Sequence, residues 1–298
     1  MNSIHKTVLL NETIEGLNLQ SSSSAKSLVI DCTFGGGGHS AEICKRYPAV
    51  KIFALDQDKS AFEKSKDKFK DLNCDISFIN ANFRDLEKVV DSKVDGIIFD
   101  LGLSSDQLEN SGRGFSFMKD EPLLMTMKEN PRSEDVTAFD VVNTWSEKSL
   151  ADIIYGYGEE RYSRRIAKAI LDSRDKKEIK TTFDLVKIIE SAVPNGYKRG
   201  KIHFATRTFQ AIRIAVNDEL GVLKTGLESG VSLLRNGGRM SVISFHSLED
   251  RVVKKFYKEM AKEGIAKMIN KKPITATNEE IKNNPRSRSA KLRVLEKI

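Results

Sequence analysis

Short apolar runs rich in β-branched residues alternate with helical patterns along the first hundred residues of the chain. Between two of these runs, Ala61, Phe62 and Phe69 recur among lysines at helical spacing, which is typical of an amphipathic surface helix. Strands that alternate with helices in this way predict βαβ units and a parallel sheet. We therefore expect a doubly wound α/β domain with strands at residues 28–31, 51–56, 76–79 and 96–100.

The strand pattern stops after Asp100, and from about residue 107 to residue 203 the apolar spacing becomes helical. Tyr162, Ile166 and Ile170 fall on one face of such a helix, whereas arginine and lysine occupy another. This stretch therefore predicts a block of helices.

Strand patterns return toward the end of the chain. Two helical patterns, at residues 209–220 and 222–234, are followed by a predicted turn at residues 236–238 and by strands at residues 239–245 and 291–296. One sheet domain interrupted by a helical insertion accounts for this order. The predicted boundaries are residues 1–106 and 206–298 for the sheet domain and residues 107–205 for the insertion.

The composition is that of a globular protein, because 31% of the 298 residues are charged and 39% are hydrophobic. The first residues are polar and no apolar run approaches the roughly 20 residues that span a bilayer, so we expect neither secretion nor a membrane partner. Cys32, Cys44 and Cys74 form no C-x-x-C motif and predict reduced thiols in a cytoplasmic protein. The four histidines match no metal-ligand spacing, so we expect no metal.

Positive charge is concentrated in two places within a net charge of +7. Residues 251–298 hold fourteen lysines and arginines against five acids, and residues 194–217 hold no acid at all. A basic excess favours a polyanionic partner such as nucleic acid, although a solvated basic surface explains it equally well.

A glycine-rich loop follows the first predicted strand. It reads Asp31-Cys32-Thr33-Phe34-Gly35-Gly36-Gly37-Gly38-His39-Ser40 and leads into a helix. Glycines allow a tight turn and the close approach of a ligand to the free N–H groups of the helix. Asp56 ends the second strand, where its carboxylate can accept hydrogen bonds from both hydroxyls of a ribose. Together these features predict a cofactor that contains adenosine.

Two cofactors fit this loop. Gly36-x-Gly38-x-x-Ala41 matches the dinucleotide fingerprint, with Asp56 at the expected distance, so a nicotinamide-dependent oxidoreductase is an alternative. Asp31 favours S-adenosylmethionine, because an acid suits the cationic amino group of that cofactor and would repel a pyrophosphate.

The fourth strand ends in Asp100-Leu101-Gly102-Leu103-Ser104-Ser105, so Asp100 and the serines are expected at the carboxyl edge of the sheet, where ligands bind in open α/β folds. Methyl transfer to an exocyclic amine requires that the nitrogen lone pair be aligned with the methyl carbon. An acceptor for the N–H of the amine would help by localising that lone pair.

Further motifs follow in one order along the chain, at residues 5–12, 33–40, 100–108, 113–118, 157–161, 203–213, 244–251 and 284–293. In these segments the sequence resembles the bacterial small-subunit rRNA cytosine-N4 methyltransferases, the RsmH or MraW family. The resemblance covers essentially the whole chain.

The resemblance implies a Rossmann-like class I S-adenosylmethionine-dependent methyltransferase sheet with an inserted helical domain. It implies methylation of N4 of a cytidine in the decoding region of 16S rRNA, with the small ribosomal subunit as partner, and it admits a homodimer. The cofactor would be bound by Gly37, Gly38, His39, Asp56, Phe83, Asp100 and Gln107, with Phe83 beside the adenine.

We expect a flipped-out or single-stranded cytidine to enter beside the catalytic candidates Asp100, Ser104 and His246. His246 could equally be a hydrogen-bonded core histidine. The RNA backbone would be bound by Arg207, Arg213 and Arg251, although the first two could instead cap helices or pair with Glu159 and Glu160.

One segment departs from the family pattern. Leu124, Thr126 and Lys128 stand where the family usually has aspartate, arginine and aspartate. This departure leaves open a divergent paralogue that methylates another nucleic-acid amine. A non-catalytic RNA-binding assembly factor is a further alternative.

Overall fold

The computed structural model describes residues 6–19, 27–72, 74–129 and 131–298. His5, the first residue of the first motif, lies outside this range. The chain divides into two compact units, and each is described by itself. Unit 1 comprises Met1–Gly102 and Leu220–Ile298, and unit 2 comprises Leu103–Glu219.

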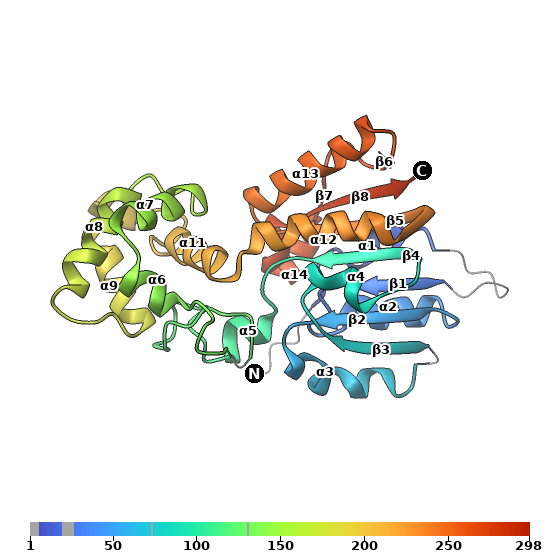
Figure 1. The fold of residues 1–298 in the computed structure, drawn as a ribbon, viewed down its shortest axis with the longest axis horizontal. Coiled ribbons are helices and arrows are strands. Elements are labelled where there is room, and N and C mark those ends of the chain that lie inside the picture. Colours follow the sequence, from blue (N-terminus) through green and yellow to red (C-terminus); the bar gives the residue numbers. More distant parts are fainter. Residues whose placement is uncertain (1–5, 20–26, 73, 130) are drawn as a thin grey trace. The chain divides into compact units, whose positions relative to one another are not determined.

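Unit 1 is built on a single sheet, whose strands lie one above another in Figure 1. Its strands run in the order β3-β2-β1-β4-β5-β8-β6, and β7 pairs with β8. Strands β1 to β5 pair in parallel with one another, whereas β8 is antiparallel to β5, β6 and β7. The strand order reverses at β1, which pairs with both β2 and β4, and ligands of such sheets bind at the carboxyl ends beside this switch point. The bounds are β1 Leu28–Asp31, β2 Lys51–Asp56, β3 Asp75–Asn80, β4 Val94–Asp100, β5 Leu234–Ser244, β6 Ala266–Met268, β7 Ile274–Thr275 and β8 Lys291–Lys297.

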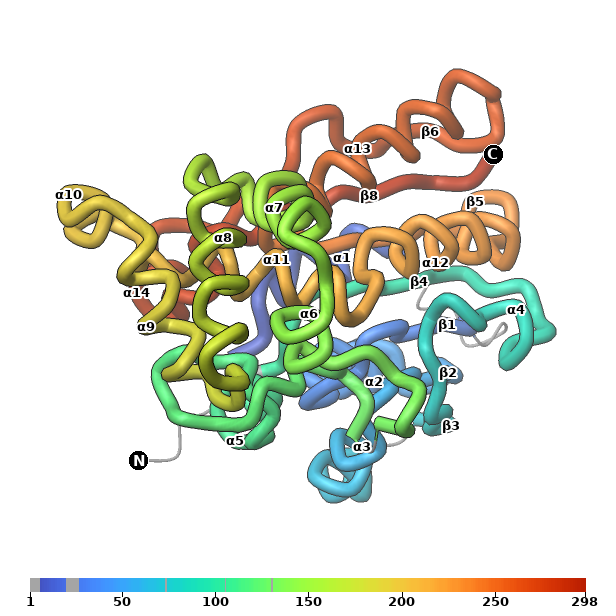
Figure 2. The backbone as a smooth tube through the Cα atoms, turned by 60° about the vertical axis from the view of Figure 1, so that its left-hand side comes forward, coloured from blue at the N-terminus to red at the C-terminus, as the bar shows by residue number. Residues whose placement is uncertain are grey.

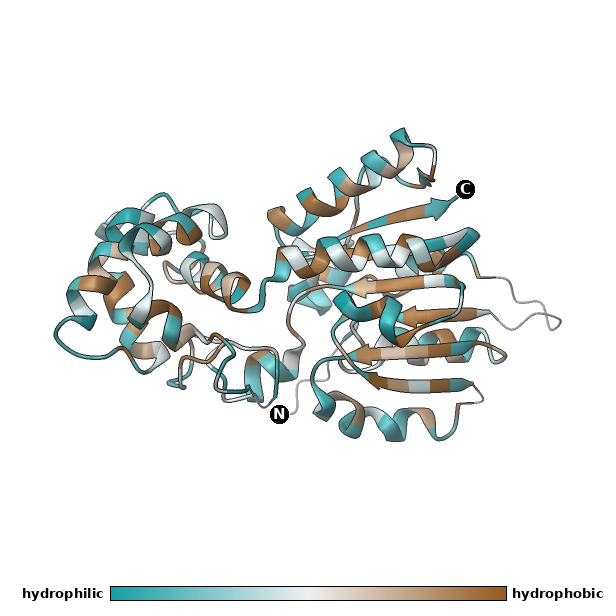
Figure 3. Ribbon diagram, viewed as in Figure 1, coloured by the Kyte–Doolittle hydropathy of each residue, from teal (hydrophilic) through white to brown (hydrophobic). Residues whose placement is uncertain are grey.

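Helices cover both faces of this sheet, so its central strands are apolar on both sides. Along β4, Ile98 packs with residues of α1, α2 and α3, whereas Ile97 and Phe99 pack with residues of α4, α12 and α13. Figure 3 shows the resulting apolar colour along the central strands. The helices are α1 Leu10–Leu17, α2 Gly38–Arg46, α3 Lys59–Ser65, α4 Leu86–Val89, α12 Glu219–Leu233, α13 Ser247–Lys262 and α14 Asn278–Asn283, with 3-10 helices η1 Lys66–Phe69, η2 Phe83–Asp85 and η3 Pro285–Ser289.

Unit 2 is helical, as its apolar spacing predicts (Figure 2). In α8, Ile166 and Ile170 are buried and the basic residues are exposed, as expected. The core is formed by side chains from α6 to α9 and α11. The bounds are α5 Ser105–Asn110, α6 Ala138–Thr144, α7 Glu147–Gly156, α8 Ser163–Arg174, α9 Thr182–Ala192, α10 Asn195–Lys198 and α11 Thr206–Asn217. Across the described parts of both units, no helix is long and apolar enough to cross a membrane.

The second boundary between the units differs from the predicted one at residue 205. Helix α11 belongs to the helical unit, because Phe209, Ala211 and Ile212 are buried in its core. The predicted turn at residues 236–238 also differs, since these residues lie within β5. Pairing between β4 and β5 shifts register there, and Gly237 has φ 81°, which marks a β-bulge rather than a turn.

Cys44 of α2 and Cys74, which precedes β3, form a disulfide, while Cys32 is free and buried. The expectation of three reduced thiols was therefore wrong. The two residues are 30 positions apart in the sequence, so only the packing of α2 beside β3 brings their Cα atoms to 5.4 Å, a separation that a disulfide can bridge.

Gly226 of α12 provides a test of the packing beside the sheet. A Cβ atom there would lie 2.6 Å from Cδ2 of Phe83, so we expect Gly226→Ala to lower the melting temperature by a few degrees. Overpacking costs about 1–3 kcal/mol and outweighs the roughly 1 kcal/mol by which alanine favours a helix. At Gly156, at the end of α7, a Cβ would meet nothing within 4 Å. Gly156→Ala should therefore leave the melting temperature unchanged or raise it, and an equal rise in both variants would contradict the contact with Phe83.

Candidate functional site

Three aspartates end three neighbouring strands of unit 1. Asp31 ends β1, Asp56 ends β2 and Asp100 ends β4. Strand β1 is parallel to both β2 and β4, so these carboxyl ends meet at the same edge of the sheet. This edge adjoins the switch point of the fold, where open α/β sheets bind their ligands.

Two of these carboxylates fix the conformation of the glycine loop. Asp31 accepts a hydrogen bond from the Ser40 hydroxyl at 2.6 Å and one from the Thr33 N–H at 3.2 Å. Asp56 accepts from the N–H groups of Gly35 at 2.8 Å and Asp58 at 2.9 Å. The loop between β1 and α2 is therefore tied to the ends of both strands.

The glycines of this loop are also required by packing. Gly37 has φ 69°, in the left-handed region that favours glycine, and it precedes the first turn of α2. A Cβ on Gly38 would lie 1.8 Å from Oγ1 of Thr7, which belongs to the first motif of the chain. Gly38 thus allows the N-terminal segment to lie directly against the loop, whereas Gly37 allows the turn itself and the packing of the Phe34 ring.

Asp100 has an oxygen that is left without a hydrogen bond. Its Oδ2 lies 3.7 Å from Nδ1 of His39, and its backbone N–H donates to Oγ1 of Thr33 at 2.7 Å. Within the described structure its Oδ1 is buried and accepts no hydrogen bond. Such an orphaned acceptor is costly unless a ligand satisfies it.

Burial shifts the titration of all three aspartates. Desolvation raises the pKa of Asp100 to about 8, and the negative charges of Asp31 and Glu249 add to this effect. Desolvation likewise raises the pKa of Asp31 and of Asp56 to about 6 each, against the lowering effect of their hydrogen bonds. A cation bound at this edge would favour the carboxylate forms, so the electrostatics of the site suit a positively charged ligand.

Phe83, the residue expected beside the adenine, begins the 3-10 helix after β3. Its ring is half-buried and packs edge-on against Phe99 of β4, with ring centroids 5.3 Å apart. The ring also lies directly against Gly226 of α12, where an added Cβ would be 2.6 Å from Cδ2 of Phe83. The ring is therefore held in a fixed position in unit 1.

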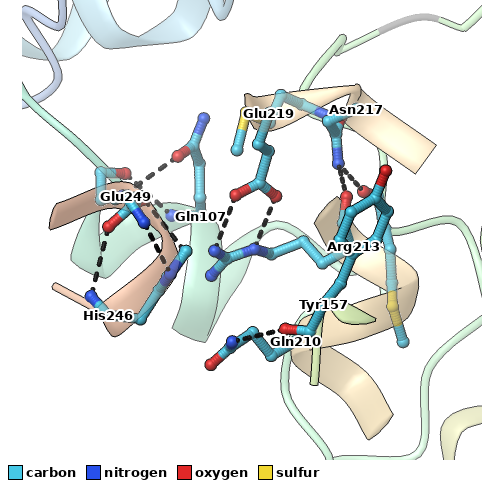
Figure 4. Close-up of polar contacts among 11 residues, drawn as sticks. Gln107, Tyr157, Gln210, Arg213, Asn217, Glu219, His246 and Glu249 are labelled. Carbon is cyan, nitrogen blue, oxygen red and sulfur yellow. Dashed lines mark hydrogen bonds and ion pairs between the residues drawn. The ribbon is translucent and has the colours of Figure 1, made fainter. Parts of the chain in front are cut away.

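His246 caps the first turn of α13. Its Nδ1 accepts a long hydrogen bond from the Glu249 N–H at 3.4 Å, and its Nε2 lies 3.2 Å from Oε1 of Glu249 (Figure 4). Glu249 is buried and accepts from the N–H groups of Phe245 and His246. Glu249 was not among the predicted site residues, although an acid three residues after a helix cap is the pattern of a capping box.

In unit 2, Ser104 and Gln107 form a capping box at the start of α5. The N–H of Gln107 donates to Oγ of Ser104 at 3.1 Å, and the N–H of Ser104 donates to Oε1 of Gln107 at 3.0 Å. Ser104 was expected to be catalytic and Gln107 to bind the cofactor. Both side chains have a local structural partner.

The arginines expected to bind RNA lie in different settings. Arg213 donates two hydrogen bonds of 2.8 Å to the carboxylate of Glu219 (Figure 4), and its side chain is only 17% exposed. Arg207 donates to the carbonyl of Glu159 at 3.3 Å, and Arg251 lies on the exposed side of α13. Of these three, Arg213 is committed to a bidentate ion pair within its own unit.

A parallel sheet that reverses its order at β1, a glycine loop after β1 and acids at the ends of β1, β2 and β4 define a Rossmann-like, S-adenosylmethionine-dependent methyltransferase. Comparison with known sequences gives the family. The model of the MraW methylase family matches residues 2–298, and the chain belongs to this family.

Individual relatives agree with this assignment. The chain is 45% identical over 314 residues to the ribosomal RNA small subunit methyltransferase H of Clostridioides difficile (strain 630), with 99% of each chain covered. It is 46% identical over 274 residues to the protein of that name from Persephonella marina, covering 91% of this chain and 92% of the relative. Among solved structures, an rRNA methylase from Streptococcus thermophilus superposes with a TM-score of 0.44 at 12% identity, over 99% of both chains.

The residues of unit 1 fit S-adenosylmethionine. The buried, unpartnered Oδ1 of Asp100 can accept a hydrogen bond from the amino group of the cofactor, in a site whose raised pKa values favour a cation. The Asp56 carboxylate accepts backbone N–H groups of Gly35, Gln57 and Asp58 and, with about four acceptor sites, can still accept a ribose hydroxyl. A pyrophosphate would meet three carboxyl groups here, which disfavours the nicotinamide alternative.

The raised pKa of Asp100 predicts that cofactor binding releases protons. At pH 7 the free protein holds Asp100 largely protonated, and a bound cation favours the carboxylate. The affinity for S-adenosylmethionine should therefore increase from pH 6 to pH 8 and level off above. Titration calorimetry in buffers of different ionisation enthalpy measures the protons released. Asp100→Asn should reduce this number, and a wild-type protein that releases no protons at pH 7 would refute the prediction.

The free energy of unfolding should decrease as the pH rises, whereas the affinity for the cofactor increases. The folded protein binds protons at Asp31, Asp56 and Asp100 more tightly than the unfolded chain, whose aspartates titrate near 3.8. The stability that these protons contribute is fully present below pH 3.8 and is lost as the pH rises through about 6 and then 8. Bound cofactor should reduce that loss.

Arg213 should matter for stability. Arg213→Ala leaves the carboxylate of Glu219, which is 9% exposed, without its bidentate partner, so we expect a loss of roughly 2–4 kcal/mol in the free energy of unfolding. Removing both charges, in Arg213→Ala with Glu219→Ala, should cost less than the sum of the two single changes. Urea unfolding measures all three variants, and an unchanged midpoint for Arg213→Ala would show that the ion pair is not structural.

Proposed function

We propose that the protein transfers a methyl group from S-adenosylmethionine to N4 of a cytidine in the decoding region of 16S rRNA, in the bacterial cytoplasm. Family membership supports the reaction class, and the relatives are named for the small ribosomal subunit. The observation that carries the proposal is the buried, unpartnered Oδ1 of Asp100 at the switch point of the sheet. The partners are the small subunit with its 16S rRNA and, as an assembly to be measured, a second copy of the chain.

In this proposal the cofactor is bound mainly by residues of unit 1. Gly37, Gly38 and His39 lie at the start of α2, where the free N–H groups of the helix can donate to it, and Asp56 accepts the ribose hydroxyls. Phe83 provides an aromatic face for the adenine. Gln107 belongs to unit 2, where its side chain completes the capping box of α5, and its contact with the cofactor is the part of this proposal that a Gln107→Ala binding measurement decides.

Asp100 is the proposed catalytic residue. The bound cofactor supplies a methyl carbon on a sulfonium, so the new N–C bond forms as the C–S bond breaks and its electron pair stays on sulfur. Asp100 can accept an N–H of the cytidine amine, which localises the lone pair on N4 and directs it. The nitrogen must then lose one proton, and the Asp100 carboxylate can accept it, because the positive charge that favoured the ionised form leaves the sulfur when the methyl group is transferred.

Ser104 and His246 act in this proposal as positioning residues. Each caps a helix that begins just after the carboxyl end of a strand, α5 after β4 and α13 after β5. They fix the segments that leave the sheet edge. Arg207 and Arg251 are retained as RNA contacts, whereas Arg213 is assigned to structure because of its ion pair with Glu219.

The proposal is tested on small subunits from a strain that lacks this activity. Wild-type protein with S-adenosylmethionine should introduce N4-methylcytidine into 16S rRNA, detected by mass spectrometry of the digested RNA. Asp100→Asn should lower kcat at least 100-fold, because the amine loses its proton acceptor. Methylation of a different amine would support the divergent-paralogue alternative and refute the assigned target.

The assignment of Asp56 is tested separately. Asp56→Asn should raise the Kd for the cofactor about 10-fold, since hydrogen bonds to a charged acceptor are lost. Asp67→Asn, in the exposed 3-10 helix after α3, is the matched control and should leave the Kd unchanged. An unaltered Kd in Asp56→Asn would remove Asp56 from the site.

A further inference from the structure

A stack of three aromatic rings lies on unit 2, apart from every residue assigned above. The rings of Phe117 and His203 are nearly parallel, 10° apart, with centroids at 4.5 Å. Phe204 follows on His203 at 4.1 Å. Phe117 also packs edge-on against the buried Phe209 of α11, so one end of the stack is anchored in the helical core.

The stack is partly open to solvent, since Phe117 and Phe204 are half-buried. His203 is exposed, and its neighbours Met118 and Ile202 are 74% and 56% exposed. Nδ1 of His203 accepts the N–H of Ala205 at 3.3 Å, so the neutral ring carries its proton on Nε2. Partial burial lowers the pKa of His203, against a raising effect of Glu190, which favours this neutral form. The ring thus offers an apolar body and one N–H donor.

Positive charge surrounds the stack. Lys198, Arg199 and Lys201 lie within six residues of His203, in the stretch of residues 194–217 that contains no acid. Lys198 is 3.7 Å from Glu190. Arg199 and Lys201 are exposed, and in the described part of the chain neither forms an ion pair. Two exposed cations therefore lie within four residues of the exposed ring of His203 in the sequence.

We propose that Phe117, Met118, Arg199, Lys201, His203 and Phe204 form an aromatic-basic surface that binds single-stranded nucleotides of the target rRNA other than the methylated cytidine. Unpaired bases stack on aromatic rings, and phosphates bind arginine and lysine. Charge complementarity favours RNA as the partner, because residues 194–217 contain lysines and arginines but no acidic residue. The inference rests on the proposed function, since it names how the same substrate is bound.

The charge component is tested by the salt dependence of binding. The probe is a synthetic fragment of the 16S decoding region, bound to the full-length protein. Arg199→Ala with Lys201→Ala should raise the Kd about 10-fold and reduce the slope of log K against log salt by roughly 1.4, the value for two lost contacts to a single strand. The matched control is Lys176→Ala with Lys177→Ala, which removes the same charge from an exposed turn of the same unit and should change neither.

The stacking component is tested at His203. His203→Ala removes the middle ring that holds Phe117 and Phe204 apart in the stack. It should raise the Kd for the RNA about 10-fold and leave the salt slope unchanged, because stacking is not electrostatic. His203→Tyr keeps a ring at this position and should restore most of the affinity. Tyr155→Ala removes another exposed aromatic ring, on α7, and is the control. Cofactor affinity and melting temperature should be unchanged in all of these variants.

The outcomes separate this inference from the proposed function. A wild-type protein that neither binds the RNA nor methylates the small subunit overturns both. A wild-type protein that does both, with the Arg199→Ala and Lys201→Ala double variant and His203→Ala each indistinguishable from its control, overturns this inference alone. Variants that keep the RNA affinity but lose binding to a purified small-subunit ribosomal protein would identify a protein interface and also overturn it.

Discussion

Burial of carboxylates at one edge of a parallel sheet is the constraint on which the site depends. Asp31, Asp56 and Asp100 each end a strand, and like charges in a desolvated place repel one another. The first two are compensated by N–H and O–H donors of the loop that they hold in place. For Asp100, Nδ1 of His39 lies 3.7 Å from Oδ2, and within the described structure the buried Oδ1 accepts no hydrogen bond, which leaves the edge ready for a cation. The same charges therefore order the loop and select the ligand.

The loop and the N-terminal motif are one packing unit. A side chain on Gly38 would occupy the place of Thr7, and one on Gly37 would come within 2.7 Å of the Phe34 ring. These glycines would be required even if no cofactor touched them. Their presence in a strand-to-helix loop therefore has two physical causes, one internal and one in the ligand. A sequence motif alone does not separate the two.

Much of the architecture could be predicted from the sequence because both faces of the sheet are covered. Strands buried on both sides appear as uninterrupted apolar runs, and the acids that end them are visible as single polar residues. The boundary at Glu219 could not be predicted, since the apolar face of α11 would have the same pattern in either core. The bulge at Gly237 and the disulfide of Cys44 with Cys74 depend on tertiary contacts that no local pattern encodes.

The roles of polar motif residues were harder to predict than the motifs themselves. Ser104 and His246 each follow a strand end, where a catalytic residue and a helix cap look alike in sequence. Basic residues that look alike in the sequence also differ in role, according to the acids near them. Arg213 lies six residues before Glu219, within reach of an acid, whereas Arg199 and Lys201 lie in a stretch without acids. A cation with a buried acid beside it has already exchanged its hydration for an internal partner, so little of its charge is available to a phosphate. The availability of a cation for RNA thus depends on its surroundings more than on its place in a motif.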